Sequence, residues 1–193
     1  FMMAIDQLDS NQFFAQLYAH TDINFDPHSG GRQMNCHFGT RMLNDQGDWK
    51  TLTDIKNSAS DISPVSGQMP RIVGLGYASK LFRNNKNLSD MHNFSINGNE
   101  VIFGTIGDAS TSEGHFWESI NACGVLQIPV VMSIWDNGYG ISVPSEYHTT
   151  RNDLSKVLSG FQRSSKKENG FELFTVKAWD YEGLLNAYSS AVN

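Results

Sequence analysis

The chain has 193 residues, of which 39% are hydrophobic and 18% are charged, and its formal net charge at pH 7 is −6. This is ordinary globular usage, and no basic run exceeds the Lys pair at 166–167, so a nucleic-acid partner is not expected. No apolar stretch approaches the roughly 18 residues of a membrane span, so no membrane partner is expected. Two cysteines, Cys36 and Cys123, are too few for a disulfide framework, and they favour a reducing, cytoplasmic location.

Both ends of the chain fall inside helical patterns, "FMMAIDQL" at the start and "GLLNAYSSAVN" at the end. We therefore expect residues 1–193 to form a single domain that belongs to a larger protein.

The first hundred residues contain two predicted helices separated by a long irregular segment. Apolar residues recur at helical spacing over 1–20 and again over 64–84. Residues 22–62 are rich in Gly, Asp, Asn, Ser and Thr, and long irregular segments inside a compact domain are usually functional or disordered. A polar connection at 84–99 follows the second helix.

The second half of the chain alternates between predicted strands and helices. A strand–helix–strand order with short links indicates a parallel α/β sheet. The expected elements are strand 100–107, helix 112–127, strand 129–136, strand 171–179 and a final helix that Asp180 caps. In helix 112–127, the residues Phe116, Ile120 and Cys123 share one apolar face.

Polar residues follow the first two predicted strands. Asp108 follows one strand and Asn137 follows the next, and the carboxyl ends of neighbouring parallel strands lie at one edge of the sheet. In open α/β sheets this edge binds ligands. Gly107 and Ala109 are small, which lets backbone N–H groups approach an anion at the start of the following helix.

The stretch "WDNGYGIS" at 135–142 has two interpretations. Asn-Gly is a common turn dipeptide, so an ordinary surface turn explains it. Alternatively, the Asp108 carboxylate, the Asn137 amide oxygen and a nearby main-chain carbonyl are the hard oxygen ligands that Mg²⁺ prefers, with a diphosphate and water completing the octahedron.

Three motifs in order resemble one family. "GDASTSEGHFWESINACGVLQIPVVMSIWDNGYGIS" resembles the thiamine-diphosphate motif that runs from GDG to NN. "GRQMNCHFG" (31–39) and "SPVSGQMPRIVGLGYASK" (63–80) are similar to loop and helix motifs of the α-type E1 component of 2-oxoacid dehydrogenase complexes, especially the branched-chain type. The resemblance implies an α/β fold with a doubly wound, mainly parallel sheet and helices on both faces.

The resemblance also implies roles at matching positions. Asp108, the Asn137 side chain and the Tyr139 carbonyl would ligate Mg²⁺. The cofactor-binding residues would be Gly107, Asp108, Ala109, Ser110 and Asn137 at the metal and diphosphate end, and Ser63, Val65 and Ile141 near the aminopyrimidine and the central bend of the cofactor. His37 would face the active-site entrance as the one candidate catalytic residue.

The chain departs from the family pattern at several positions. Ala109 replaces the third motif glycine, Asp136 replaces the first motif asparagine, and Trp135 stands where some relatives carry an Arg that contacts the diphosphate. Gly67 replaces a Thr of the potassium loop, so potassium is not expected. Two alternatives remain. One is another thiamine-diphosphate enzyme of the transketolase type, against which the "GRQM" loop and "NGYGIS" argue; the other is a non-catalytic domain that has lost the cofactor, which Ala109 and Asp136 leave open.

Other patterns have simpler explanations. "GLGYAS" (74–79) imitates a dinucleotide fingerprint but lies within a helical pattern, so close helix packing explains its small residues. Glu113 is a favourable helix-start carboxylate. Cys36 and His37 are adjacent on a loop, and adjacent side chains seldom meet at one point as nucleophile and base.

The resemblance therefore implies an oxidoreductase that uses thiamine diphosphate and Mg²⁺ to decarboxylate a 2-oxoacid and to pass the acyl unit to a lipoyl group. The expected partners are a pyrimidine-binding domain or β-type E1 subunit and a lipoyl-bearing E2, in an oligomer. The carboxylate that activates the cofactor would come from that partner, so this chain alone is expected to be inactive.

Overall fold

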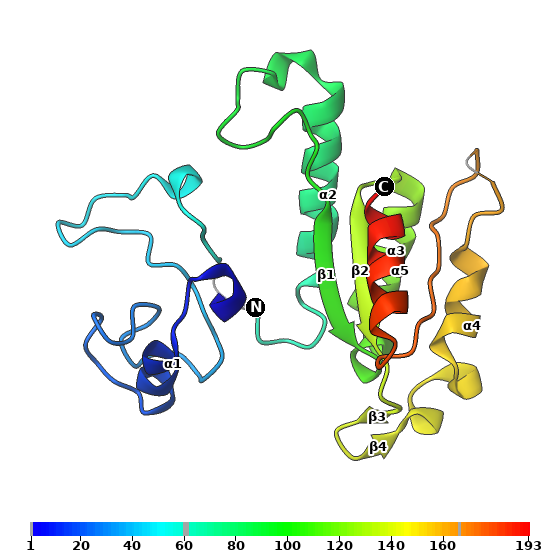
Figure 1. Ribbon diagram of the computed structural model, residues 1–193, viewed down its shortest axis with the longest axis horizontal. Helices are drawn as coiled ribbons and strands as arrows, with labels where there is room; N and C mark the ends of the chain where they lie inside the picture. The colour runs from blue at the N-terminus through cyan, green and yellow to red at the C-terminus, as the bar shows by residue number, and fades with distance from the viewer. Residues whose placement is uncertain (1, 60–61, 166) are drawn as a thin grey trace. The chain divides into compact units, whose positions relative to one another are not determined.

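The computed structural model describes residues 2–59, 62–165 and 167–193. The chain divides into two compact units, an N-terminal unit of Phe1–Ser63 and a C-terminal unit of Pro64–Asn193. Figure 1 shows that the N-terminal unit is mostly irregular, whereas the C-terminal unit contains the sheet and the longer helices. Each unit is described by itself below, and the single domain expected for residues 1–193 stays a prediction.

The prediction of one continuous helix over residues 1–20 is wrong. It consists of a 3₁₀ helix, η1 (Met2–Ile5), and an α-helix, α1 (Ser10–Leu17). Asp6 has a positive φ of 59°, which interrupts helical geometry. Asp9 then starts α1 with a capping box, because its side chain accepts from the Gln12 N–H and its own N–H donates to the Gln12 side chain.

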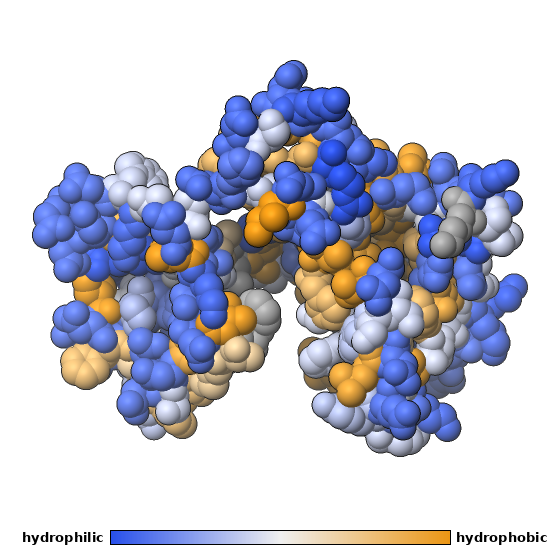
Figure 2. Space-filling view, turned by 45° about the horizontal axis from the view of Figure 1, so that its top comes forward, coloured by the Kyte–Doolittle hydropathy of each residue, from blue (hydrophilic) through white to orange (hydrophobic). Residues whose placement is uncertain are grey.

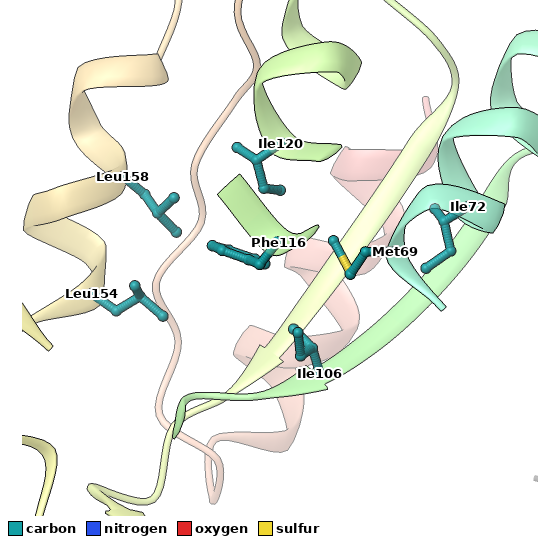
Figure 3. Close-up of a cluster of buried hydrophobic side chains, with 7 residues drawn as sticks. All are labelled: Met69, Ile72, Ile106, Phe116, Ile120, Leu154 and Leu158. Carbon is teal, nitrogen blue, oxygen red and sulfur yellow. The ribbon is translucent and has the colours of Figure 1, made fainter. Parts of the chain in front are cut away.

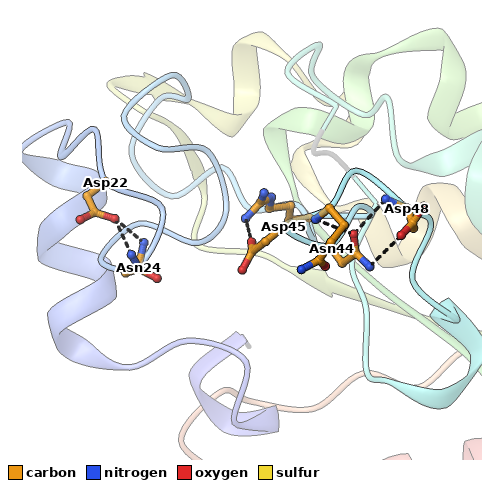
Figure 4. A network of polar contacts seen from close by, with 7 residues as sticks. Asp22, Asn24, Asn44, Asp45 and Asp48 are labelled. Carbon is orange, nitrogen blue, oxygen red and sulfur yellow. Dashed lines mark hydrogen bonds and ion pairs between the residues drawn. The ribbon is translucent and has the colours of Figure 1, made fainter.

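The irregular segment predicted over 22–62 is confirmed for its described residues; residues 60 and 61 lie outside them. It contains one short 3₁₀ helix, η2 (Leu52–Asp54), and an isolated bridge between Leu43 and Trp49. Short polar side chains hold its turns: Asn44 Oδ1 accepts from the Asp48 N–H at 2.9 Å, as Figure 4 shows.

The strand–helix–strand prediction is confirmed in the C-terminal unit. Strands β1 (Ile102–Gly107) and β2 (Val130–Trp135) pair in parallel, with Ile102 opposite Val130 and Gly107 opposite Trp135. The connecting helix is α3 (Gly114–Leu126). This is a mixed α/β unit with a small, two-stranded parallel sheet.

Helices cover both faces of this sheet. On one face, α2 (Met69–Asn84) and α3 pack over β1 and β2. On the other face, Tyr188 of α5 (Tyr181–Val192) contacts the Phe103 ring at 5.3 Å between centroids and the Ser133 hydroxyl at 2.7 Å. Asp180 caps α5 as predicted, accepting from the Gly183 N–H at 2.9 Å.

The core lies between α2, α3, the sheet and α4 (Leu154–Leu158). Phe116 of α3 is fully buried at its centre, and Ile120 follows one turn later, as the predicted apolar face of this helix requires. Figure 3 shows the seven buried side chains, which are Met69, Ile72, Ile106, Phe116, Ile120, Leu154 and Leu158.

The strand predicted over 171–179 is wrong. Phe171 makes only an isolated parallel bridge with Gln162, and the backbone after it is irregular. The segment is held instead by side chains: Phe171 stacks on Phe161 at 5.9 Å, and Glu172 pairs with Arg163 at 2.6 Å. Without a neighbouring strand to accept its hydrogen bonds, the apolar alternation does not produce a strand.

The remaining elements are short. A small antiparallel pair, β3 (Tyr139–Gly140) and β4 (Val143–Pro144), follows β2. The 3₁₀ helices are η3 (Lys86–Leu88), η4 (Ala109–Ser112), η5 (Ser145–Tyr147), η6 (Thr150–Asn152) and η7 (Ser159–Phe161). Within the described ranges, none of the helices has the length and apolar character needed to cross a bilayer.

Candidate functional site

The carboxyl ends of β1 and β2 meet at one edge of the sheet (Figure 1). Gly107 lies opposite Trp135, and the Asp108 N–H donates to the Trp135 carbonyl at 3.1 Å. Asp108 and Asn137 therefore follow directly from neighbouring strand ends, which is the shared edge that the chain order predicts.

Asp108 is a buried carboxylate with one unused oxygen. The residue is 4% exposed, and its Oδ2 atom is buried without a hydrogen-bond partner in the described chain. Its main-chain carbonyl is held by Thr111, whose N–H and hydroxyl both donate to it at 3.1 and 2.5 Å. A buried carboxylate oxygen without a partner is costly, and a bound cation would satisfy it.

The loop after β2 is a turn stabilised by its own side chains. Asp136 Oδ1 accepts from the Gly138 N–H at 3.0 Å, and Asn137 Oδ1 accepts from the Tyr139 N–H at 2.9 Å. Gly138 has a φ of 78°, a backbone region that glycine adopts without strain. The turn interpretation of this stretch is confirmed locally. It leaves the ligand interpretation open, because an amide oxygen has a second lone pair.

The loop after β1 is packed closely against the loop after β2. Ala109 begins η4, and a Cβ atom placed on Gly140 would lie 2.6 Å from the Ala109 Cβ, so only glycine fits at 140 without displacement. A Cβ on Gly107 would meet only the Ser110 hydroxyl, at 3.9 Å, which leaves the backbone before Asp108 accessible.

Ser66 also belongs to this loop system, although sequence reasoning did not single it out. It is 3% exposed, has a φ of 62°, and donates its hydroxyl to the Ser110 carbonyl at 2.7 Å. Its place in the "SPVSGQ" stretch beside Val65 was the available signal. Val65 and Ile141 are both exposed, Ile141 fully.

His37 and Ser63 lie in the N-terminal unit. The Gln16 side chain of α1 fixes the backbone around His37, because its amide nitrogen donates to the His37 carbonyl at 2.6 Å and its oxygen accepts from the Cys36 N–H at 2.7 Å. His37 Nδ1 lies 3.2 Å from the Asn35 carbonyl, so this ring nitrogen faces the backbone rather than the Cys36 thiol.

Within the part of the chain that the structure describes, no group of three or more His, Cys, Asp or Glu side chains is arranged to hold a metal ion. The donors predicted at the Asp108 edge are of a different kind, namely the Asp108 carboxylate, the Asn137 amide oxygen and the Tyr139 carbonyl. Such all-oxygen donors suit Mg²⁺, which takes its remaining ligands from phosphates and water, and they do not suit a structural zinc site.

Comparison with known proteins identifies the class. Residues 2–178 match the family model of the dehydrogenase E1 component, so the chain belongs to that family.

Its relatives include 2-oxoisovalerate dehydrogenase α subunits. The Bacillus subtilis subunit is 30% identical over 145 residues, which cover 75% of this chain and 36% of the relative. The human mitochondrial subunit is 26% identical over 164 residues, which cover 85% of this chain and 30% of the relative. The chain therefore spans about a third of the length of these curated relatives.

Proposed function

We propose that this chain is the diphosphate- and Mg²⁺-binding part of a thiamine-diphosphate-dependent 2-oxoacid dehydrogenase E1. The observation that supports the proposal best is the buried, unpartnered Oδ2 of Asp108. It lies at the sheet edge where β1 and β2 end, and Asn137 lies in the loop after β2. A cation bound there would offset the cost of burying that oxygen without a partner.

The chain's own groups would divide the work of holding the cofactor. Asp108, Asn137 Oδ1 and the Tyr139 carbonyl would ligate Mg²⁺. The backbone N–H groups of Ala109 and Ser110 would donate to the diphosphate, and the absence of a side chain at Gly107 leaves this loop accessible. Ser66 would keep this loop in place by its hydrogen bond to Ser110.

The remaining site residues are proposed from the family pattern. Ser63, Val65 and Ile141 would line the cofactor away from its diphosphate, and His37 would line the entrance. Exposure of Val65 and Ile141 supports this role, since both side chains are free to contact a ligand.

When bound, thiamine diphosphate supplies the carbanion chemistry that removes CO₂ from a 2-oxoacid and transfers the acyl unit to a lipoyl group. We propose a branched-chain 2-oxoacid as substrate, because the named relatives act on 2-oxoisovalerate. This chain would anchor and orient the cofactor, and the family likeness supports a doubly wound sheet larger than the two strands of β1 and β2.

The proposed partners are a pyrimidine-binding domain or β-type subunit and a lipoyl-bearing E2, within an oligomer that acts in the cytoplasm. Large apolar side chains around the loop after β2 support a partner on this edge: Trp135, Tyr139, Ile141 and Tyr147 are all more than half exposed. We also propose that residues 1–193 act together as one cofactor-binding domain.

The test is calorimetric titration of thiamine diphosphate, with and without Mg²⁺, into the intact E1 protein. The Asp108→Asn variant keeps the shape of the side chain and removes its charge, so Mg²⁺-dependent binding should weaken at least a hundredfold. Glu113→Gln removes an exposed carboxylate from the start of α3 and should bind like the wild type.

Absence of Mg²⁺-dependent binding to the wild-type protein would overturn the proposal and favour a non-catalytic domain that has lost the cofactor. Equal binding by wild type and Asp108→Asn would show that the metal is held elsewhere.

A further inference from the structure

A second buried polar atom at this edge has no partner. His148 follows η5, and its Nε2 is inaccessible to solvent and makes no hydrogen bond within the described chain. The other ring nitrogen, Nδ1, lies 2.9 Å from the Thr149 hydroxyl. Buried polar atoms are nearly always hydrogen-bonded, so an unpaired ring nitrogen indicates a group that the polypeptide does not supply.

The imidazole lies beside the two loops that carry the cofactor-binding residues. A Cβ placed on Gly140 would lie 4.0 Å from His148 Nε2 and 2.6 Å from the Ala109 Cβ. The imidazole and the start of η4 therefore both border the space that a side chain at 140 would fill. The two distances place Nε2 within about 7 Å of the Ala109 Cβ, beside the backbone proposed to meet the diphosphate.

The main chain of His148 is fixed to both loops. Its carbonyl accepts from the Ser112 hydroxyl at 2.9 Å, at the end of η4, and its N–H donates to the Ser145 carbonyl at 3.1 Å. The Ser145 N–H in turn donates to the Gly138 carbonyl at 2.9 Å, in the turn that contains Asn137. These bonds hold the backbone of His148 in place, and the contact between Nδ1 and the Thr149 hydroxyl orients the ring.

The stretch of sequence that carries both loops and His148 contains no Lys or Arg before Arg151 of η6. From residue 87 to residue 150 the chain contains no Lys and no Arg, whereas Asp108 and Asp136 are acidic. A diphosphate bound by residues 87–150 would therefore be held mainly by a metal ion and by backbone N–H groups. The side-chain donors that the stretch offers beside Ala109 include the Ser110 hydroxyl and the imidazole of His148.

We propose that His148 is a diphosphate-binding residue, whose Nε2–H donates to a phosphate oxygen of the cofactor; this rests on the proposed function. When the Thr149 hydroxyl donates to Nδ1, the neutral ring carries its proton on Nε2, which is the tautomer that the contact needs. The buried nitrogen then gains a charge-assisted hydrogen bond.

The test compares two substitutions at one position by calorimetry on the intact E1 protein with Mg²⁺. Gln places an amide nitrogen near the position of Nε2, whereas Asn places one near Nδ1 and leaves the Nε2 position empty. We expect His148→Asn to bind thiamine diphosphate about ten- to a hundredfold more weakly, and His148→Gln to stay within about threefold of the wild type. Inorganic pyrophosphate, titrated alone with Mg²⁺, should show the same order because the lost contact is to the anion.

The matched control is His115→Asn, at an exposed histidine of α3, which should bind like the wild type. Thermal unfolding without cofactor should be similar for both His148 variants. If His148→Asn binds with wild-type affinity, the inference is overturned, and a water molecule would be the partner of Nε2. Equal weakening in His148→Asn and His148→Gln would also overturn it, because the shape of the ring rather than its N–H donor would then matter. Neither result contradicts the proposed function. That proposal fails only if the wild type does not bind thiamine diphosphate with Mg²⁺, or if Asp108→Asn binds as tightly as the wild type.

Discussion

Two buried aspartates of this chain differ in how their oxygens are used. Asp26 is fully buried and accepts from the Gly31 N–H, from the Ser29 N–H and hydroxyl, and from the His28 N–H. Asp108 is nearly as buried, but its Oδ2 has no partner in the described chain. A carboxylate that is fully satisfied stabilises a loop, whereas one with an unused oxygen is a candidate ligand.

Asp26 should make the loop at 26–31 sensitive to acid. Burial alone would raise the pKa of Asp26, but hydrogen bonds from Gly31, Ser29 and His28 outweigh it and lower the pKa below its ordinary value of 3.8. A lowered folded-state pKa contributes stability that is fully present above pH 3.8 and is lost as the pH falls through the folded value.

Hydrogen exchange at the Gly31 amide measures this effect. Protection should persist at neutral pH and fall below about pH 3.8, and at neutral pH it should be weaker in Asp26→Asn than in the wild type. Asp45→Asn removes an exposed aspartate of the same unit and should leave Gly31 protection unchanged. Unchanged protection in Asp26→Asn would contradict the role given to this carboxylate.

At the scale of elements, α2 explains why a fingerprint-like sequence occurs in a helix. "GLGYAS" lies inside α2, as its helical spacing predicts, and Gly76 is buried against the sheet. A Cβ on Gly76 would lie 2.8 Å from Val130 Cγ2 and 3.1 Å from Ile128 Cδ1, so the helix approaches β2 only because this residue has no side chain. Gly74, two residues earlier, has open space around it.

The two glycines should therefore respond oppositely to alanine. Gly76→Ala should lower the free energy of unfolding by about 1–3 kcal/mol, because the added methyl group overpacks the interface with β2. Gly74→Ala should raise it by about 0.5–1 kcal/mol, because alanine restricts the unfolded chain and favours the helix. Urea unfolding of both variants measures the difference. Effects of the same sign would show that α2 does not lie against β2 as described.

At the scale of the whole molecule, apolar side chains are exposed on both units. Figure 2 shows strongly hydrophobic residues in orange among the hydrophilic ones. In addition, Trp49 of the N-terminal unit and Trp179 of the C-terminal unit are three-quarters exposed or more. Large exposed aromatic side chains are enriched where proteins meet partners. This surface accords with a chain that spans about a third of its relatives and that we propose acts within an assembly.

The two free cysteines report on the integrity of the C-terminal unit. Burial raises the pKa of the Cys123 thiol to about 11, so at pH 8 it is protonated and unreactive, whereas Cys36 is exposed. In a Cys36→Ser variant, labelling of Cys123 by iodoacetamide should be slow in buffer and fast in urea. Equal rates in the two conditions would mean that the packing around α3 is not stable.

Local patterns in the sequence determined the strand–helix–strand unit, the buried face at Phe116 and the cap at Asp180, because periodicity and capping depend on neighbours along the chain. Chain order also brought Asp108 and Asn137 to one edge, and the motifs indicated the E1 family. Only the tertiary structure decided which polar atoms lack partners. The unpartnered Oδ2 of Asp108, the hydrogen bond from Ser66 to Ser110 and the position of His148 beside Gly140 all depend on contacts between separate elements. The strand predicted over 171–179 was wrong for the same reason. Alternation of apolar and polar residues fits a strand, but a strand forms only beside a neighbouring strand, and the sequence pattern does not identify that neighbour.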